Sequence, residues 1–65
     1  MLVNVEAERA RQGLTKAATA KTLGVSQKSY MAYVTENRPI PSDTLIKMAQ
    51  LFGKSTDYLL GLTDN

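Results

Sequence analysis

The sequence predicts an all-α fold, in which five short helices form one compact domain over residues 1–65. Apolar residues recur mostly at three- and four-residue spacings, the period of an amphipathic helix, and no strand-like alternation is sustained. Glycines and capping residues interrupt this pattern at short intervals, so the helices must be short. Because helices of this length rarely hold alone in water, we expect packing against one another to stabilise them.

The first helix is expected at residues 4–12. Asn4 can cap its N-terminus, because an asparagine oxygen accepts a hydrogen bond from a free N–H group of the first turn. Glu6 and Glu8 would then lie near the positive end of the helix dipole, where anions are favoured. Gly13 follows the predicted helix, and glycine readily takes the positive φ that ends many helices.

Two helices with a tight turn between them are expected next. The first covers residues 16–23 after the N-cap Thr15, and it ends at Gly24, which can form a sharp bend. The second covers residues 27–35 after the N-cap Ser26. This order of helix, tight turn and helix is typical of a helix-turn-helix unit. A corner between two helices of any small bundle would produce the same local pattern.

The last two helices follow a loop that contains two prolines. Residues 36–41 form this loop, because two prolines with a single residue between them oppose the continuation of a helix. The fourth helix is expected at residues 43–52, where apolar residues repeat at i, i+4 and i+7, and the fifth at residues 56–60. Ser42 stands at the start of the fourth helix, and Ser55 can cap the fifth. The polar tail, residues 62–65, is predicted to be mobile.

The composition excludes most enzymes. The chain has no cysteine and no histidine, so it lacks the side chains of thiol nucleophiles, zinc fingers and imidazole acid–base catalysts. No paired carboxylates, glycine-rich phosphate loop or nucleophile with its base occurs at a useful spacing. We therefore expect no catalytic activity and no cofactor. The absence of a long apolar run and of a signal-peptide pattern predicts a cytoplasmic location.

Positive charge is concentrated in the middle of the chain. The whole sequence has a formal net charge of +2, whereas residues 9–38 contain six basic side chains and one acidic one. Both flanking segments are net negative. This distribution favours a polyanionic partner such as nucleic acid, although chance clustering on a solvated surface would also produce it.

Five segments, in their order and spacing, have residues that are typical of a known family. The segments are Gly-Leu-Thr at 13–15, Ala-Lys-Thr-Leu-Gly-Val-Ser at 20–26, Arg-Pro-Ile-Pro-Ser at 38–42, Leu-Ile-Lys-Met-Ala at 45–49 and Ser-Thr-Asp-Tyr-Leu-Leu-Gly at 55–61. Together they resemble the lambda-repressor-like helix-turn-helix proteins, which include phage repressors, Cro proteins and XRE regulators. The resemblance implies five helices, of which the third enters the major groove of DNA, commonly as one half of a homodimer on a palindromic operator.

The resemblance implies that the first half of the third helix faces the bases, through Gln27, Lys28 and Ser29, with Met31 and Ala32 continuing the surface. A glutamine amide can pair with N6 and N7 of adenine, and a lysine can reach guanine acceptors or a phosphate. Ala32 could touch a thymine methyl group. Gln27 and Lys28 could also be an ordinary exposed helix turn, and Met31 could equally cover the core.

Contacts to the DNA backbone are expected on either side of this helix. Lys16 stands where the family commonly has a glutamine that contacts the sugar-phosphate backbone, at a helix N-terminus whose free N–H groups also favour phosphate. Only the second and third predicted helices have first turns without an acid, which points to the same face. Asn37 and Arg38 are expected to hold the backbone at the far edge of the site, with plain solvation as the alternative for Arg38.

A self-association surface is expected near the fifth helix, through Tyr58, Leu59 and Leu62, as family members form there. Plain core packing is the alternative for these three residues. Tyr30 and Tyr33 invite a base-stacking interpretation, but their spacing places them on one inward stripe, so we expect core roles for both.

Several further positions depart from the family pattern. Thr19 replaces an aliphatic residue, so either its hydroxyl bonds back to a backbone carbonyl or the second helix packs loosely. Glu36 and Asn37 stand near a position often held by glycine, which leaves the shape of that turn open. Val34 replaces a glutamate that commonly pairs with an arginine of the first helix. Arg9 is therefore expected to face solvent or backbone carbonyls.

Two functional hypotheses follow. The first is sequence-specific binding of double-stranded DNA by a transcriptional regulator, in particular a repressor from a phage or mobile element. The second is a helix-turn-helix that has lost its DNA contacts and serves as a protein-binding module, like an antitoxin or an anti-repressor. The small net charge keeps the second hypothesis open, and the salt dependence of binding separates the two.

Overall fold

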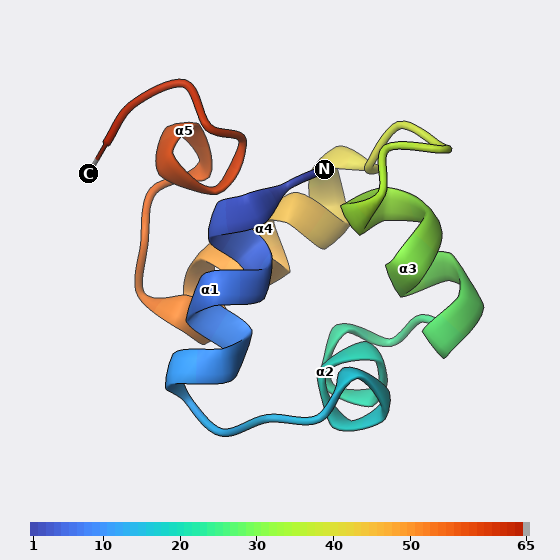
Figure 1. Ribbon diagram of the computed structural model, residues 1–65. Helices are drawn as coiled ribbons and strands as arrows, with labels where there is room; N and C mark the ends of the chain where they lie inside the picture. The colour runs from blue at the N-terminus through green and yellow to red at the C-terminus, as the bar shows by residue number, and fades with distance from the viewer. Residues whose placement is uncertain (65) are drawn as a thin grey trace.

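Five α-helices follow one another along residues 1–64, which are the residues that the computed structural model describes (Figure 1). The predicted all-α fold is confirmed, and each helix lies within one residue of its predicted bounds. The prediction of a mobile tail extends to Asn65, which lies outside the described residues. The helices are α1 (Val3–Arg11), α2 (Lys16–Leu23), α3 (Gln27–Val34), α4 (Ser42–Phe52) and α5 (Thr56–Leu59).

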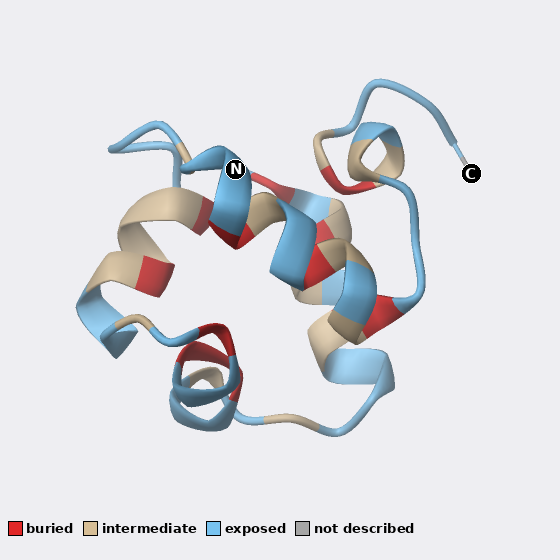
Figure 2. Cartoon of the chain, turned by 180° about the vertical axis from the view of Figure 1, so that it is seen from behind, coloured by how far each residue is buried: buried red, intermediate tan, exposed pale blue. Residues whose placement is uncertain are grey.

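The core lies between α1 and the helices that surround it. α1 contacts α3, α4 and α5, while α2 packs against α3 and α4 (Figure 1). Buried residues line the inward sides of the helices (Figure 2). None of the helices in residues 1–64 is long and apolar enough to span a membrane. The buried apolar side chains are those of Leu2, Val5, Ala20, Leu23, Tyr30, Val34, Met48, Phe52 and Leu59.

Three of the predicted N-caps form. In each, the side-chain oxygen accepts a hydrogen bond from the backbone N–H three residues later, at 3.0–3.1 Å. The prediction for Asn4 is wrong, because α1 begins one residue earlier, after Leu2. The Asn4 amide instead donates to the backbone carbonyl of Tyr58 at 2.7 Å and so fastens α1 to α5. The confirmed N-caps are Thr15, Ser26 and Ser55.

One carboxylate, that of Glu8, is buried against the core. It accepts a hydrogen bond from the Tyr58 hydroxyl at 3.0 Å and forms an ion pair with the Arg11 guanidinium at 2.8 Å. The hydrogen bond to this carboxylate, followed by burial, raises the pKa of Tyr58, so its hydroxyl stays a donor at neutral pH. The expectation that Glu8 lies near the positive end of the dipole is wrong, because α1 has only Glu6 in its first turn.

Burial corrects two predictions and confirms a third. Leu59, expected on a self-association surface, is fully buried (0% exposed), because it is the inward-facing residue of the four-residue helix α5. Tyr30 is buried as predicted, but Tyr33 is only half-buried. Thr19 is fully buried, and its hydroxyl donates to the carbonyl of Thr15 at 2.9 Å. The predicted back-bond therefore forms, and it gives a hydrogen-bond partner to the Thr19 hydroxyl, a polar group that an aliphatic residue at this position would not have.

The turn after α3 keeps a left-handed backbone even though it has no glycine. Glu36 has a φ of 65° and is the only non-glycine residue with positive φ in residues 1–64. A residue with a Cβ atom at such a φ is strained by roughly 1–2 kcal/mol. Glu36 also accepts an ion pair from the N-terminal amine of Met1 at 2.6 Å, with both groups more than half exposed.

We expect Glu36→Gly to be more stable than Glu36→Gln by about 0.5–1 kcal/mol. Both variants lose the exposed ion pair, but only glycine relieves the strain, and its larger unfolded-state entropy offsets part of the gain. Urea unfolding of the two variants side by side measures the difference. Equal midpoints would mean that the turn stores no strain at Glu36.

Candidate nucleic-acid interface

α2 and α3 form a helix-turn-helix unit on the side of the molecule away from α5 (Figure 1). Gly24 ends α2 with a φ of 76°, and the N–H of Val25 donates to the carbonyl of Ala20 at 3.0 Å, which closes the turn. Ala20 and Leu23 are buried, and Val25 packs on the core between the two helices. Because small and branched apolar residues fill this corner, the angle between α2 and α3 is set by the core.

A polar network fastens α3 to α1 from the inside. The Tyr30 hydroxyl donates to the Glu6 carboxylate at 2.6 Å, and the Arg9 guanidinium donates to the same carboxylate at 2.9 Å. Arg9 also donates to the carbonyl of Leu14 at 2.6 Å. The expected carbonyl contact of Arg9 is thus present, but its acidic partner, Glu6 on its own helix, was missed. The i,i+3 spacing of Glu6 and Arg9 was the available signal.

At neutral pH the Glu6 carboxylate of this network stays ionised and the Tyr30 hydroxyl stays protonated. Burial alone would raise the pKa of Glu6, but hydrogen bonds from Arg9 and Tyr30, with the charges of Arg9 and Lys16, outweigh it and lower the pKa. Burial, followed by the hydrogen bond to Glu6, raises the pKa of Tyr30. The donor and acceptor states that hold α3 in place therefore persist at any physiological pH.

The first turn of α3 presents two of the predicted recognition residues to solvent. Gln27 and Lys28 are exposed, and within residues 1–64 neither side chain has a hydrogen-bond or ion-pair partner. Met31 and Ala32 are half-buried, and Met31 packs against the core. Ser29 is also half-buried and its hydroxyl is already engaged. The exposed polar side chains of α3 are therefore confined to its leading turn.

The N-terminus of α2 is a second position in the helix-turn-helix unit that favours an anion. Lys16 is its first residue, and the first turns of α2 and α3 contain no acid. Acids do occupy the first turns of the other helices, as Glu6 in α1, Asp43 in α4 and Asp57 in α5. Anions are favoured at a helix N-terminus without a carboxylate. The predicted difference between the two sets of helices is thus present in the structure.

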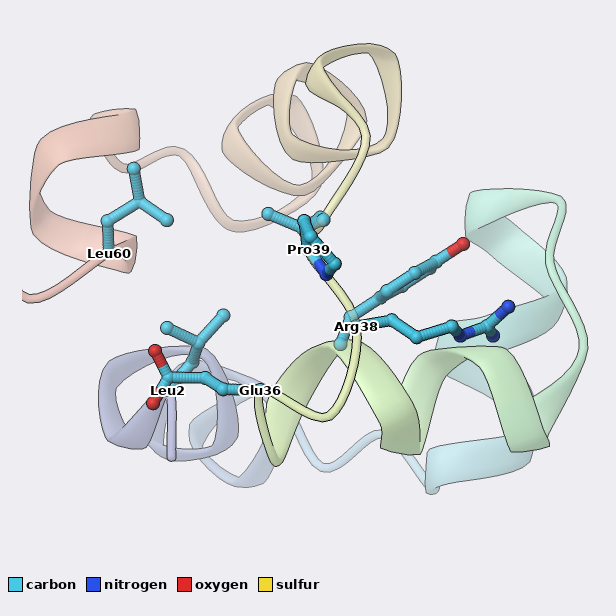
Figure 3. A pocket seen from close by; sticks show the side chains of 7 residues that line it. Leu2, Glu36, Arg38, Pro39 and Leu60 are labelled. Atoms are coloured by element: carbon cyan, nitrogen blue, oxygen red, sulfur yellow. The ribbon is translucent and has the colours of Figure 1, made fainter.

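The loop after α3 adds one cation that is held in place and one exposed amide. Arg38 donates from Nη2 to the Ser29 hydroxyl at 2.8 Å, and its Cζ atom lies 5.2 Å from the centroid of the Tyr33 ring. The Arg38 side chain extends along α3 (Figure 3). Asn37 is exposed. Sequence reasoning missed the contact of Arg38 with α3, because it depends on how the loop folds back.

A pocket of about 380 Å³ lies behind this cation, between the end of α3 and α5 (Figure 3). Tyr33 and Arg38 line one part of it, and Leu2 and Leu60 line another.

Among the described residues, the basic side chains of α1 have acidic partners, whereas those of the helix-turn-helix unit and its following loop do not. Arg9 and Arg11 of α1 each pair with a glutamate on the same helix, whereas Lys16, Lys28 and Arg38 have no carboxylate within 4.0 Å in residues 1–64. Within the basic segment 9–38, the positive charge without a paired carboxylate therefore lies on the helix-turn-helix unit and its following loop.

The residues expected in self-association are divided by the fold. Leu62 is 73% exposed and Tyr58 is half-buried, while Leu59 belongs to the core. The N–H of Leu62 donates to the carbonyl of Asp57 at 2.8 Å, which ties the start of the tail to α5. An exposed apolar side chain is thus held at this end of the molecule.

Comparison with known proteins places this geometry in a family. A helix-turn-helix family model matches residues 5–59. An uncharacterized HTH-type transcriptional regulator of Bacillus subtilis (strain 168), YobD, is 40% identical over 52 residues, which cover 80% of this chain and 46% of the relative. The HTH-type transcriptional regulator ImmR of the same organism is 36% identical over 53 residues, which cover 82% of this chain and 42% of the relative.

The chain spans less than half the length of these two curated relatives. The match of the family model, in contrast, covers nearly the whole of the described structure, from α1 to the last residue of α5. The arrangement of α2, the turn at Gly24 and α3 is the element that gives the family its name. The chain therefore belongs to the lambda-repressor-like helix-turn-helix family, as its sequence predicted.

Proposed function

We propose that residues 1–65 are a single DNA-binding domain that recognises a specific double-stranded sequence by placing α3 in the major groove. The observation that carries this proposal is the leading turn of α3, where Gln27 and Lys28 are exposed and have no hydrogen-bond or ion-pair partner among the described residues, on a helix that the Tyr30–Glu6 hydrogen bond ties to α1. A recognition helix needs side chains that are free to meet base edges and a backbone that cannot shift. The names of the two relatives, both transcriptional regulators, support the same function.

In this proposal the two kinds of contact have different carriers. The Gln27 amide donates to N7 and accepts from N6 of an adenine, and Lys28 donates to guanine acceptors or to a phosphate. Ala32 lies one turn further along α3, where a methyl group can meet that of a thymine. Phosphates are held by Lys16 with the free N–H groups of α2, and by Asn37 and Arg38.

We further propose that two copies bind a palindromic operator and that the chain acts as a repressor of phage or mobile-element origin. α5, which contains the half-buried Tyr58 and is followed by the exposed Leu62, lies on the side away from the helix-turn-helix unit (Figure 1), where a second copy leaves α3 free. A symmetric pair of recognition helices reads two half-sites about one turn of DNA apart.

Selection of binding sites from random duplexes, followed by sequencing, tests the proposal. A palindromic consensus is expected, and binding to it should weaken by orders of magnitude between 50 and 200 mM salt, because phosphate contacts release counterions. Failure to enrich any sequence, together with binding to a protein partner that is insensitive to salt, would favour the protein-binding module instead.

Replacing Lys16 with alanine should weaken binding to every duplex alike and reduce the slope of log K against log salt by about one unit. The reason is that one phosphate contact, and no base contact, is lost. Titration of a selected duplex and an unrelated duplex at several salt concentrations measures both effects. Lys54→Ala is the matched control, because Lys54 is an exposed lysine next to α5 and should leave the slope unchanged. An unchanged slope for Lys16→Ala would remove Lys16 from the phosphate contacts.

A further inference from the structure

Arg38 is anchored to α3 at three points. Its backbone N–H donates to the carbonyl of Ala32 at 3.2 Å, its Nη2 donates to the Ser29 hydroxyl at 2.8 Å, and its Cζ atom lies 5.2 Å from the Tyr33 ring centroid. Ser29 and Tyr33 are one helical turn apart, so they present one face to the same guanidinium. An exposed arginine, which would otherwise sample many rotamers, is thereby held in one pose.

The anchored guanidinium keeps its charge and most of its donors for an external partner. A guanidinium has five N–H donors, and the contact with Ser29 uses one of them. No carboxylate in residues 1–64 pairs with Arg38, and the nearby Glu36 pairs with the N-terminal amine of Met1 at 2.6 Å instead. The face of the Tyr33 ring stabilises the cation without neutralising it.

Neither Ser29 nor Tyr33 is one of the fully buried residues of the core. Ser29 and Tyr33 are both half-buried, whereas Tyr30 and Val34 on the inward face of α3 are fully buried. The Ser29 hydroxyl is the acceptor of the Arg38 bond, while its N–H group is satisfied by the N-cap Ser26 at 3.0 Å. The ring of Tyr33 is therefore placed to support a surface cation as well as to pack.

We propose that Ser29 and Tyr33 are positioning residues that hold the Arg38 guanidinium along α3 as a pre-ordered donor to a phosphate of the DNA backbone. This inference rests on the proposed DNA-binding function and deepens it. It gives Ser29 a role that acts through Arg38 rather than through a base, and it gives Tyr33 a role in binding. A guanidinium ordered before association loses less conformational freedom when it meets the forked oxygens of a phosphate.

A set of variants at Tyr33 and Arg38 tests the inference by coupling. The affinity of the chain for a 20-base-pair duplex obtained by selection, and for an unrelated duplex of the same length, is measured at several salt concentrations. Arg38→Ala should weaken binding to both duplexes by about tenfold and lower the salt slope by about one unit. Tyr33→Leu should weaken binding by about threefold in the unmodified chain, and not at all when combined with Arg38→Ala.

Two further variants separate positioning from packing. Tyr33→Phe keeps the ring face and should restore most of the affinity that Tyr33→Leu loses, while Ser29→Ala should weaken binding only when Arg38 is present. Thermal unfolding of each variant, followed by circular dichroism, identifies any loss that comes from instability. A loss of affinity that tracks stability and is additive with Arg38→Ala would overturn the positioning role.

The outcomes also distinguish this inference from the function on which it rests. If the unmodified chain shows no salt-dependent binding to any duplex, both fail. If it binds DNA and the effects of Tyr33→Leu and Arg38→Ala simply add, only the positioning role fails. A loss for Arg38→Ala that is confined to one base pair would overturn the assignment to a phosphate, because phosphate contacts carry no sequence information.

Discussion

Leu59→Ala is expected to lower the free energy of unfolding by about 2–5 kcal/mol, the usual cost of truncating a buried leucine. Leu59 is 0% exposed and is the one buried residue of α5, a helix of only four residues. Removing its side chain leaves α5 held by the contacts of Tyr58 with Glu8 and Asn4. A domain of this size has a total stability of roughly 3–10 kcal/mol, so the variant should be largely unfolded at elevated temperature.

The matched control is Leu62→Ala. Leu62 is a leucine of the same end of the chain but is 73% exposed, so its truncation should change the unfolding free energy by less than about 0.5 kcal/mol. Chemical denaturation gives both values. If the proposed pairing of two copies involves Leu62, this variant should instead raise the dissociation constant of the dimer, measured by analytical ultracentrifugation. A stable Leu59→Ala variant would contradict the burial of α5 against the core.

The helices could be predicted because their signals are local. Thr15, Ser26 and Ser55 each cap a helix through a bond to a residue three positions later, and this short range makes the cap readable from the sequence. The back-bond of Thr19 to Thr15 spans one turn and was predictable for the same reason. Gly24 marks the turn of the helix-turn-helix because its φ is one that residues with a Cβ atom rarely adopt.

The features that could not be predicted depend on partners far away in the sequence. Glu8 is buried because Tyr58, fifty residues later, donates a hydrogen bond to it, and nothing near Glu8 indicates this partner. Asn4 lies inside α1 rather than at its N-cap, and its amide donates to the backbone carbonyl of Tyr58, a contact that nothing near Asn4 indicates. Leu59 was assigned to a surface because a four-residue helix is too short for apolar periodicity to separate its inner and outer faces.

The candidate site divides in the same way. The exposure of Gln27 and Lys28 follows from their place in the first turn after a cap, which the sequence shows. The position of Arg38 does not, because it depends on a loop that folds back so that its N–H reaches the carbonyl of Ala32. The sequence pattern therefore indicates which residues could contact DNA, whereas the structure is needed to see how they are held.

Gln27→Ala is expected to reduce the affinity for the selected operator by about 1–3 kcal/mol and to relax the choice of base at one position of each half-site. The amide of Gln27 is exposed in the first turn of a helix that the Tyr30–Glu6 hydrogen bond ties to α1. Loss of a bidentate contact to adenine removes the discrimination against other bases at that position. Affinity for an unrelated duplex should barely change, because that binding depends on phosphate contacts.

Competition binding with a panel of operators, each changed at a single base pair, measures this effect. Gln50→Ala provides the matched control, since Gln50 is an exposed glutamine on α4, outside the helix-turn-helix unit, and should leave every affinity in the panel unchanged. An equal loss on all duplexes would contradict base reading by Gln27 and assign it to the backbone instead. A loss at one base pair, with the salt slope preserved, is the result expected when the leading turn of α3 reads a base edge, because phosphate contacts alone cannot distinguish one base pair from another.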